Sequence, residues 1–182
     1  MAVVVGPDVR GMVRGLARYR VEWVLAGSVA ALAWYPGRWP FMPGDLDVVP
    51  ARTPANLRRL AGLLDGLGAK PVHDPAWREN LSSEACAAWT PWPPTEERLD
   101  RLFETALGRL DVVPGRAGHF EALRPRSHAL LAWDISVLVA DPEDLAITLR
   151  PAKPKHAARR ALMEEIRVRR ARGEAPCRLS PD

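Results

Sequence analysis

The sequence predicts a mixed α+β (α/β) domain in which helices flank one central mixed sheet. Three observations indicate this fold class. The chain has 182 residues, about the size of one domain. Short apolar runs of strand length occur among amphipathic stretches with helical spacing, and their order follows no regular βαβ repeat. We expect a single domain over 1–182, with a core at about 20–140, a basic helical segment at about 141–172 and a frayed tail at 173–182.

The first half of the chain should alternate helices with strands. Apolar residues with helical spacing predict two amphipathic helices, and short apolar runs predict strands. Gly27-Ser28 marks a turn, and Ser28 is expected to cap the helix that follows. The expected elements are a helix at 8–19, a strand at 23–26, a helix at 29–34, a Pro- and aromatic-rich loop at 35–44, a strand at 45–49, a helix at 54–67 and a short strand at 69–72.

The second half should be richer in strand pairs. Asp141 and Pro142 have the residue types of a helix N-cap and first helical position. The expected elements are an irregular Trp-rich stretch at 73–94, a hairpin of 101–105 with 109–113, a strand pair of 127–132 with 135–140, a helix at 143–149 and a long basic helix at 157–172.

Composition excludes several protein classes. The chain is 47% hydrophobic and 26% charged, as in ordinary globular proteins, and its 18 prolines and 13 glycines argue against a coiled coil. The longest charge-free apolar stretch, 23–37, has 15 residues, whereas a membrane span needs roughly 20. No signal peptide is evident, and Cys86 and Cys177 form no CxxC motif. These features predict a cytoplasmic protein without a membrane segment.

Positive charge is concentrated in the C-terminal segment. Residues 1–149 contain 16 basic and 18 acidic side chains, whereas 150–182 contain 10 basic and 4 acidic ones. A basic stripe is typical of a surface that contacts a phosphate-rich partner such as RNA. A solvated helix face would have the same composition, and this interpretation stays open.

The Gly27-Ser28 turn lies between a predicted strand and a predicted helix. Glycine permits close approach of a ligand to the backbone, and the N–H groups of a helix N-terminus favour a phosphate. An ordinary turn with a helix cap has the same residues, so this motif alone does not distinguish the two.

Two carboxylates occur at alternate positions of one predicted strand. Asp45 and Asp47 are two residues apart and should project from the same face of the sheet. Like charges at this distance repel unless a cation neutralises them, and Mg²⁺ or Mn²⁺ prefers oxygen ligands. Asp111 also precedes two valines, so it would join them if its strand lay alongside. The alternative is that these acids lie on solvated strand faces.

The order of these motifs resembles the nucleotidyltransferase superfamily related to DNA polymerase β. Within it, the chain is most similar to minimal bacterial nucleotidyltransferases, above all to the abortive-infection toxins of type IV toxin–antitoxin systems. Gly27-Ser28-Val29-Ala30 resembles the family's Gly-[Gly/Ser]-x-Ala turn, and Asp45-Leu46-Asp47 its Asp-x-Asp strand. The stretches that resemble later elements of the family are 103–111, 139–145 and 153–156.

The resemblance implies the nucleotidyltransferase fold and an enzyme that transfers NMP from an NTP to an acceptor hydroxyl. Asp45, Asp47 and Asp111 would be catalytic and would hold Mg²⁺ or Mn²⁺, with Asp111 positioning or deprotonating the acceptor. Gly27 and Ser28 would bind the phosphates. Arg38, Lys153 and Lys155 would add nucleotide contacts, and Arg150, Arg159 and Arg160 are further candidates for contacting the nucleotide or RNA. The family also implies an RNA acceptor and an antitoxin partner.

Alternatives of other kinds are consistent with the same residues. Pro43-Gly44 stand where the family has Ser or Thr before the Asp-x-Asp, and His156 replaces an Asp. These differences favour a catalytically silent nucleotide- or partner-binding module. A small-molecule (antibiotic) nucleotidyltransferase and a metal-dependent phosphohydrolase are further alternatives. Trp39, in the loop before the acidic strand, is expected either to stack on a base or to pack in the core.

Overall fold

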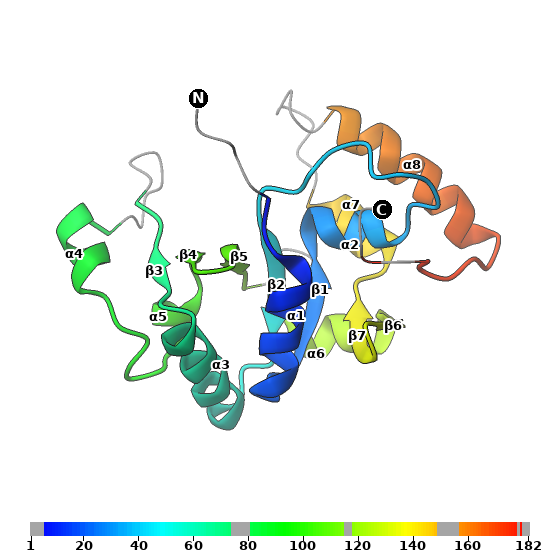
Figure 1. Cartoon of the computed structure of the whole chain (residues 1–182). Coiled ribbons are helices and arrows are strands. Elements are labelled where there is room, and N and C mark those ends of the chain that lie inside the picture. The colour runs from blue at the N-terminus through cyan, green and yellow to red at the C-terminus, as the bar shows by residue number, and fades with distance from the viewer. Residues whose placement is uncertain (1–5, 74–80, 115–117, 149–156, 178, 180–182) are drawn as a thin grey trace.

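The computed structural model has one seven-stranded mixed sheet flanked by helices (Figure 1). It describes residues 6–73, 81–114, 118–148, 157–177 and 179. The strand order is β3-β4-β5-β2-β1-β7-β6. Neighbouring strands are antiparallel except β2 with β5 and β1 with β7, which run parallel. The predicted mixed α+β class is therefore confirmed.

The strands agree closely with the sequence prediction. Both hairpins predicted for the second half of the chain form, as β4 with β5 and as β6 with β7. The predicted strand at 69–72 is reduced to two residues. The strands are β1 (Trp23–Ala26), β2 (Leu46–Pro50), β3 (Lys70–Pro71), β4 (Leu102–Thr105), β5 (Gly108–Val112), β6 (His128–Ala132) and β7 (Ile135–Val139).

The longer helices were predicted, whereas several short ones were not. No sequence pattern indicated α4, in the stretch interpreted as irregular, or α5, α6 and the 3-10 turn η1. The helices are α1 (Val9–Arg18), α2 (Gly27–Ala33), α3 (Pro54–Gly66), α4 (Ser83–Ala88), α5 (Glu96–Leu99), α6 (Phe120–Leu123), η1 (Arg124–Arg126), α7 (Pro142–Ile147) and α8 (Ala157–Ala171).

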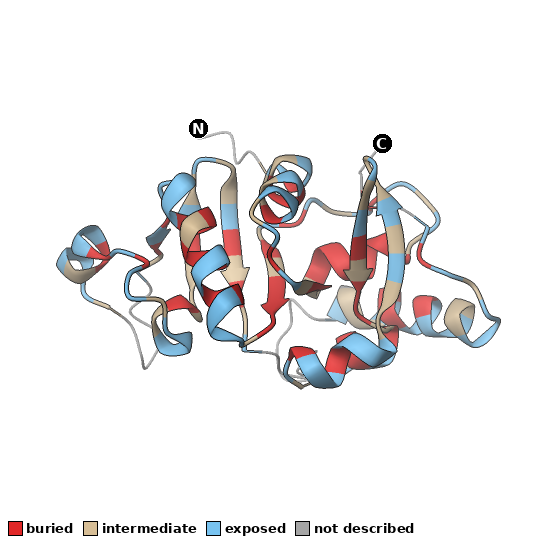
Figure 2. Cartoon of the chain, turned by 90° about the horizontal axis from the view of Figure 1, so that it is seen from below, coloured by how far each residue is buried: buried red, intermediate tan, exposed pale blue. Residues whose placement is uncertain are grey.

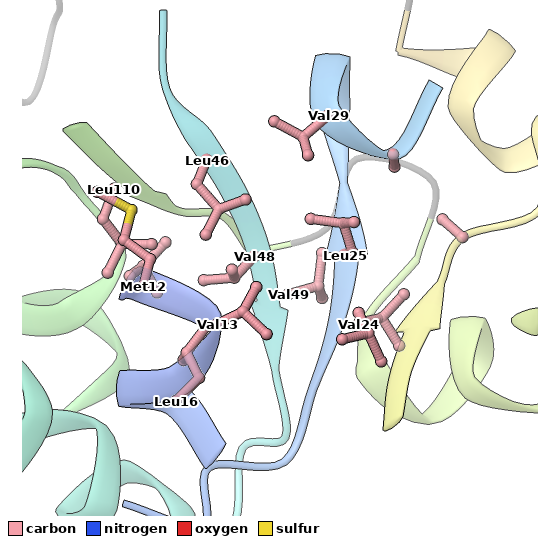
Figure 3. Close-up of a cluster of buried hydrophobic side chains, with 14 of the residues drawn as sticks. Met12, Val13, Leu16, Val24, Leu25, Val29, Leu46, Val48, Val49 and Leu110 are labelled. Atoms are coloured by element: carbon pink, nitrogen blue, oxygen red, sulfur yellow. The ribbon is translucent and has the colours of Figure 1, made fainter. Parts of the chain in front are cut away.

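The core lies between the sheet and its helices. Figure 3 shows Met12, Val13 and Leu16 of α1 packing toward β2 and β5. Helices α1 and α3 turn buried side chains inward and exposed ones outward, the amphipathic pattern their sequences predict (Figure 2). The same buried cluster includes Leu162 and Ile166 of α8, so the core extends beyond the predicted 20–140 at both ends.

Two local predictions were wrong. Ser28 does not cap α2, because the helix begins at Gly27, two residues earlier than expected, and its N-cap is Ala26, whose methyl side chain cannot accept a hydrogen bond. The described part of the tail is not frayed: the Cys177 N–H donates to the carbonyl of Ala33 at 2.8 Å, and Leu179 is buried. A backbone hydrogen bond to α2 and the burial of Leu179 thus order a segment whose composition predicted fraying.

Helix α8 is anchored to the rest of the domain by ion pairs as well as by its apolar face. Asp141 caps α7 by accepting from the Glu143 N–H at 3.0 Å, and the same carboxylate lies 2.9 Å from His128 Nε2. Arg170 donates to it at 3.2 Å, and Arg167 donates to Glu143 at 2.7 Å. These contacts connect β6, α7 and α8 and define where the basic helix lies.

Within the part of the chain that the structure describes, no helix combines the length and apolar character needed to cross a membrane.

Candidate functional site

The carboxylates singled out in the sequence lie on neighbouring strands at the centre of the sheet. Parallel pairing of β2 with β5 places Asp47 directly beside Asp111. Side chains of paired residues point to the same face, so Asp47 and Asp111 project on one side. Asp45 stands one residue before β2, and its carboxylate is near enough to Asp47 to raise the pKa of that residue. Leu46, Val48 and Leu110 point the other way, into the core. The expectation that the strand of Asp111 lies beside that of Asp47 is therefore confirmed.

The turn into α2 reaches the same carboxylates. Antiparallel pairing places Ala26, the residue before Gly27, opposite Asp47. Gly27 has a positive φ of 62°, a conformation that favours glycine. A Cβ on Gly27 would lie only 2.8 Å from the Cβ of Asp47 and would overlap its carboxylate. The Ser28 backbone N–H is near enough to favour the charged form of Asp47 and to oppose the rise of its pKa, so the turn and the acidic strand form one local unit.

The electrostatic state of Asp47 reflects this crowding. Its pKa is raised to about 8, mainly by burial, and further by the carboxylates of Asp45 and Asp111. The Arg159 guanidinium and the Ser28 N–H act in the opposite direction and favour the charged form. Because ionisation of Asp47 is unfavourable here, a nearby cation would strongly stabilise the charged form of this carboxylate.

The three carboxylates fit a hard divalent cation by their chemistry, although their side chains do not converge on one point. Among the residues that the structure describes, no group of three His, Cys, Asp or Glu side chains is close enough to hold a metal ion as it stands. Oxygen donors on one sheet face, with a raised pKa from mutual repulsion, are what Mg²⁺ or Mn²⁺ would stabilise. The three predicted metal ligands therefore lie near one another but do not form a preformed metal site.

One basic residue from the far end of the chain belongs to this site. Arg159, near the start of α8, has its guanidinium carbon 5.7 Å from the ring centroid of Phe41. Phe41 lies in the loop between α2 and β2, which runs beside α8 in Figure 1. From the sequence, Arg159 was only one of several possible RNA or nucleotide contacts, and Phe41 was missed. The sequence indicated the aromatic-rich loop at 35–44, but no pattern in it indicated that this loop contacts α8.

The remaining predicted site residues are not brought together. Arg38 is exposed in the loop before β2, and the structure gives it no described contact with the carboxylates. Arg150, Lys153 and Lys155 lie outside the described residues. Trp39 is 8% exposed and belongs to the core cluster, so of the two uses considered for it, packing is the one observed.

The basic stripe predicted for the C-terminal segment is partly neutralised within the protein. Arg167 forms ion pairs with Glu143 and Glu164, and Arg170 pairs with Asp141. Arg169 pairs with Glu174. Charge that is already paired contributes less to binding a polyanion, so the N-terminal half of α8 is the better candidate for such a contact.

Substitution of Gly27 by Ala should lower both stability and ligand binding. The substitution forces an L-residue into a positive φ and drives a methyl group into the Asp47 carboxylate. Gly68→Ala is a matched control, because Gly68 has φ 61° and a methyl group there would meet nothing within 4 Å. We expect Gly68→Ala to cost about 1 kcal/mol of unfolding free energy and Gly27→Ala at least about 2 kcal/mol more. Equal losses in urea titrations would show that Asp47 does not occupy this space.

The chain matches no protein-family model and no curated protein sequence. What the site does must therefore be inferred from its own residues.

Proposed function

We propose that the protein is a metal-dependent nucleotidyltransferase that transfers NMP from an NTP to an acceptor hydroxyl, on a nucleotidyltransferase fold. The observation that carries the proposal is the pairing of Asp47 with Asp111 across two parallel strands, with the Asp45 carboxylate close to Asp47. The Gly27-Ser28 turn beside them supplies backbone N–H groups next to the carboxylates.

The roles of the residues follow from their positions. Asp45, Asp47 and Asp111 would hold Mg²⁺ or Mn²⁺, which when bound would neutralise phosphate charge and stabilise the leaving group. Asp111 lies on a different strand from the other two and would accept the proton of the acceptor hydroxyl. The hydroxyl oxygen then bonds to the α-phosphorus as the bond to the β-phosphate oxygen breaks, and pyrophosphate leaves. Gly27 lets the turn approach the Asp47 carboxylate closely, and the backbone N–H groups of this turn would bind the phosphates beside the metal ligands.

The direct test is transfer from labelled NTPs. Purified protein is incubated with each of the four α-³²P-labelled NTPs, Mg²⁺ or Mn²⁺, and total RNA, with a parallel reaction containing no RNA. Label on RNA would identify the acceptor, and label on the protein would indicate self-modification. Release of labelled nucleotide without transfer would instead indicate a phosphohydrolase. No consumption of any NTP under these conditions would contradict the proposal.

RNA as the acceptor is the part of the proposal that depends on the basic segment. Replacing Lys153, Lys155 and Arg160 by Ala should weaken RNA binding and flatten its salt dependence, because phosphate contacts release counterions. Three lost contacts to single-stranded RNA would reduce the slope of log K against log salt by about 2. Binding would be measured by fluorescence anisotropy at several salt concentrations.

The control removes the same charge from another face. Arg10, Arg14 and Arg18 are exposed on α1, and their replacement by Ala should leave RNA affinity nearly unchanged. If both triple variants lose affinity equally, RNA responds to net charge alone and the segment is not a binding site.

A second candidate, a catalytically silent binding module, is favoured by one specific contact. The Ser28 N–H lies beside the Asp47 carboxylate and favours its charged form, although a bound phosphate would need this donor. A module of this kind would bind nucleotide or a protein partner without consuming NTP. The labelled-NTP reaction distinguishes the two, since binding without turnover supports only the module.

A further inference from the structure

The two edges of the sheet differ in how they are protected against pairing with another chain. The edge strand β3 has only two residues, Lys70 and Pro71, and short length, lysine and proline all discourage such pairing. The other edge strand, β6, has the five-residue sequence HALLA, in which no residue is acidic, lysine, arginine or proline. Leu131 on this strand is 73% exposed, the largest value among the large apolar side chains that the structure describes. The outermost strand beside β7 is therefore the unprotected edge (Figure 1).

The backbone of β6 has hydrogen-bonding groups that β7 does not use. The two-residue turn Trp133-Asp134, with positive φ at both residues, joins the strands, so Ala132 and Ile135 form a hydrogen-bonded pair. Such pairs alternate with unbonded ones along an antiparallel ladder, so the N–H and C=O groups of Ala129 and Leu131 point away from β7. Within the described ranges of the chain, no backbone group pairs with them. This edge is thus ready to add another strand.

A second copy of β6 fits this edge as an antiparallel partner. In a pair centred on Leu130, Ala129 of each copy lies opposite Leu131 of the other. These are the two residues whose N–H and C=O groups point outward, so they form the hydrogen-bonded pairs of an antiparallel ladder. The contact has two-fold symmetry, because the same residues serve on both sides, and it therefore closes at two copies.

Charges at the two ends of β6 favour this register. Arg126 precedes the strand and Asp134 follows it, and a pair centred on Leu130 places residue 126 of one copy opposite residue 134 of the other. Unlike charges therefore meet at both ends of the contact, whereas a shifted register would separate them. Arg126 donates to Asp144 at 2.7 Å, but its side chain is still 51% exposed and accessible to a second carboxylate.

We propose that the protein forms a weak homodimer by antiparallel pairing of β6 with β6 of a second copy, so that the two sheets continue as one. The strand registers place Ala129 and Leu131 on the same sheet face as Asp47, so the carboxylates of both copies open to the same side. Each copy supplies its own carboxylates from β2 and β5, so the dimer does not depend on the proposed function.

The expected dissociation constant is on the order of 10–100 µM, because pairing of one short strand buries less than the roughly 1,200 Å² of a stable interface. Sedimentation equilibrium over a roughly hundredfold range of concentration should show the monomer giving way to a dimer and to nothing larger. Amide hydrogen exchange should locate the contact. The amides of Ala129 and Leu131 should exchange about fivefold more slowly at high than at low concentration, whereas that of Leu130, which bonds to β7 in both states, should not change.

Leu131→Lys and Leu131→Glu test the contact with little effect on the fold, because this side chain is 73% exposed. Leu131 of one copy is the diagonal neighbour of Leu131 of the other, so like charges there repel. Each substitution occurs twice in a symmetric pair, so the dissociation constant of each variant should rise at least about tenfold. An equimolar mixture of the two variants should associate again, because lysine then faces glutamate.

Ile147→Lys is the matched control. It adds the same charge in place of an apolar side chain of α7 that is 65% exposed, and it should associate like the wild type. A wild type that is monomeric at every concentration, or exchange at Ala129 and Leu131 that is independent of concentration, would overturn the proposal. So would an equal loss of association in Ile147→Lys, or a mixture of the two Leu131 variants that stays monomeric. Recovery in the mixture shows that both variants are folded and that β6 is the contact.

Discussion

In metal-free buffer the free energy of unfolding should fall as the pH rises from about 5 to about 8. Burial and the neighbouring carboxylates raise the pKa of Asp47 from 3.8 to about 8 in the folded protein. Between these values the native state holds a proton that the unfolded chain has released, so a rising pH favours unfolding. The stabilisation of the native state by this proton is fully present below pH 4. It decreases as the pH rises to about 8 and does not change further above that. The expected loss between pH 5 and pH 8 is about 4 kcal/mol, measured by urea titration in EDTA.

Asp47→Asn separates this effect from the general pH response of the protein. The amide is neutral at every pH, so the variant should lack the decline and be more stable than the wild type at pH 8. Asp65→Asn on α3 is the control, because Asp65 is exposed and its neutralisation should leave the slope unchanged. Saturating Mg²⁺ should stabilise the wild type at pH 8, by about 2.7 kcal/mol at a hundredfold excess over the dissociation constant. If the unfolding free energy of wild type and of Asp47→Asn fell equally with rising pH, this result would contradict the assigned burial of Asp47.

Local sequence signals predicted the central elements of the fold well. The apolar run before Gly27-Ser28 is β1, and the alternation of Asp and Leu or Val after the loop is β2. Such elements are determined largely by local signals, the periodicity and the turn residues within a short stretch of the chain. Helices of four to six residues, such as α4 and α5, have too few turns for a periodic signal, and their ends depend on caps such as Ser82 and Thr95.

The candidate site could be predicted only in part. The spacing of Asp45 and Asp47 predicts their shared face, since side chains alternate along a strand. Pairing of β2 with β5 joins segments about sixty residues apart and is decided by tertiary packing, so the position of Asp111 was conditional. The contact of Arg159 with Phe41 depends on how α8 packs, which no local pattern encodes.

Asp111→Asn should abolish nucleotidyl transfer while preserving binding of the triphosphate. Asp111 lies beside Asp47 on β5, and in the proposed reaction it accepts the proton of the attacking hydroxyl. The amide keeps the size of the side chain but is not a base, so the transfer rate should fall by about 10²- to 10⁴-fold. Asp45 and Asp47 remain, and tripolyphosphate affinity measured with Mg²⁺ should change by less than about threefold, about half of the 1.4 kcal/mol that a tenfold change represents.

Asp134→Asn provides the isosteric control for this measurement. Asp134 is exposed in the turn between β6 and β7, at φ 64°, a conformation that Asn also adopts readily. Strand β1 separates that hairpin from β2, so transfer should proceed at the wild-type rate. A transfer rate within tenfold of the wild type in Asp111→Asn would remove Asp111 from the chemistry. Loss of tripolyphosphate binding together with transfer would instead make it a ligand-binding residue, because a base contributes to the reaction and not to the affinity of the ground state.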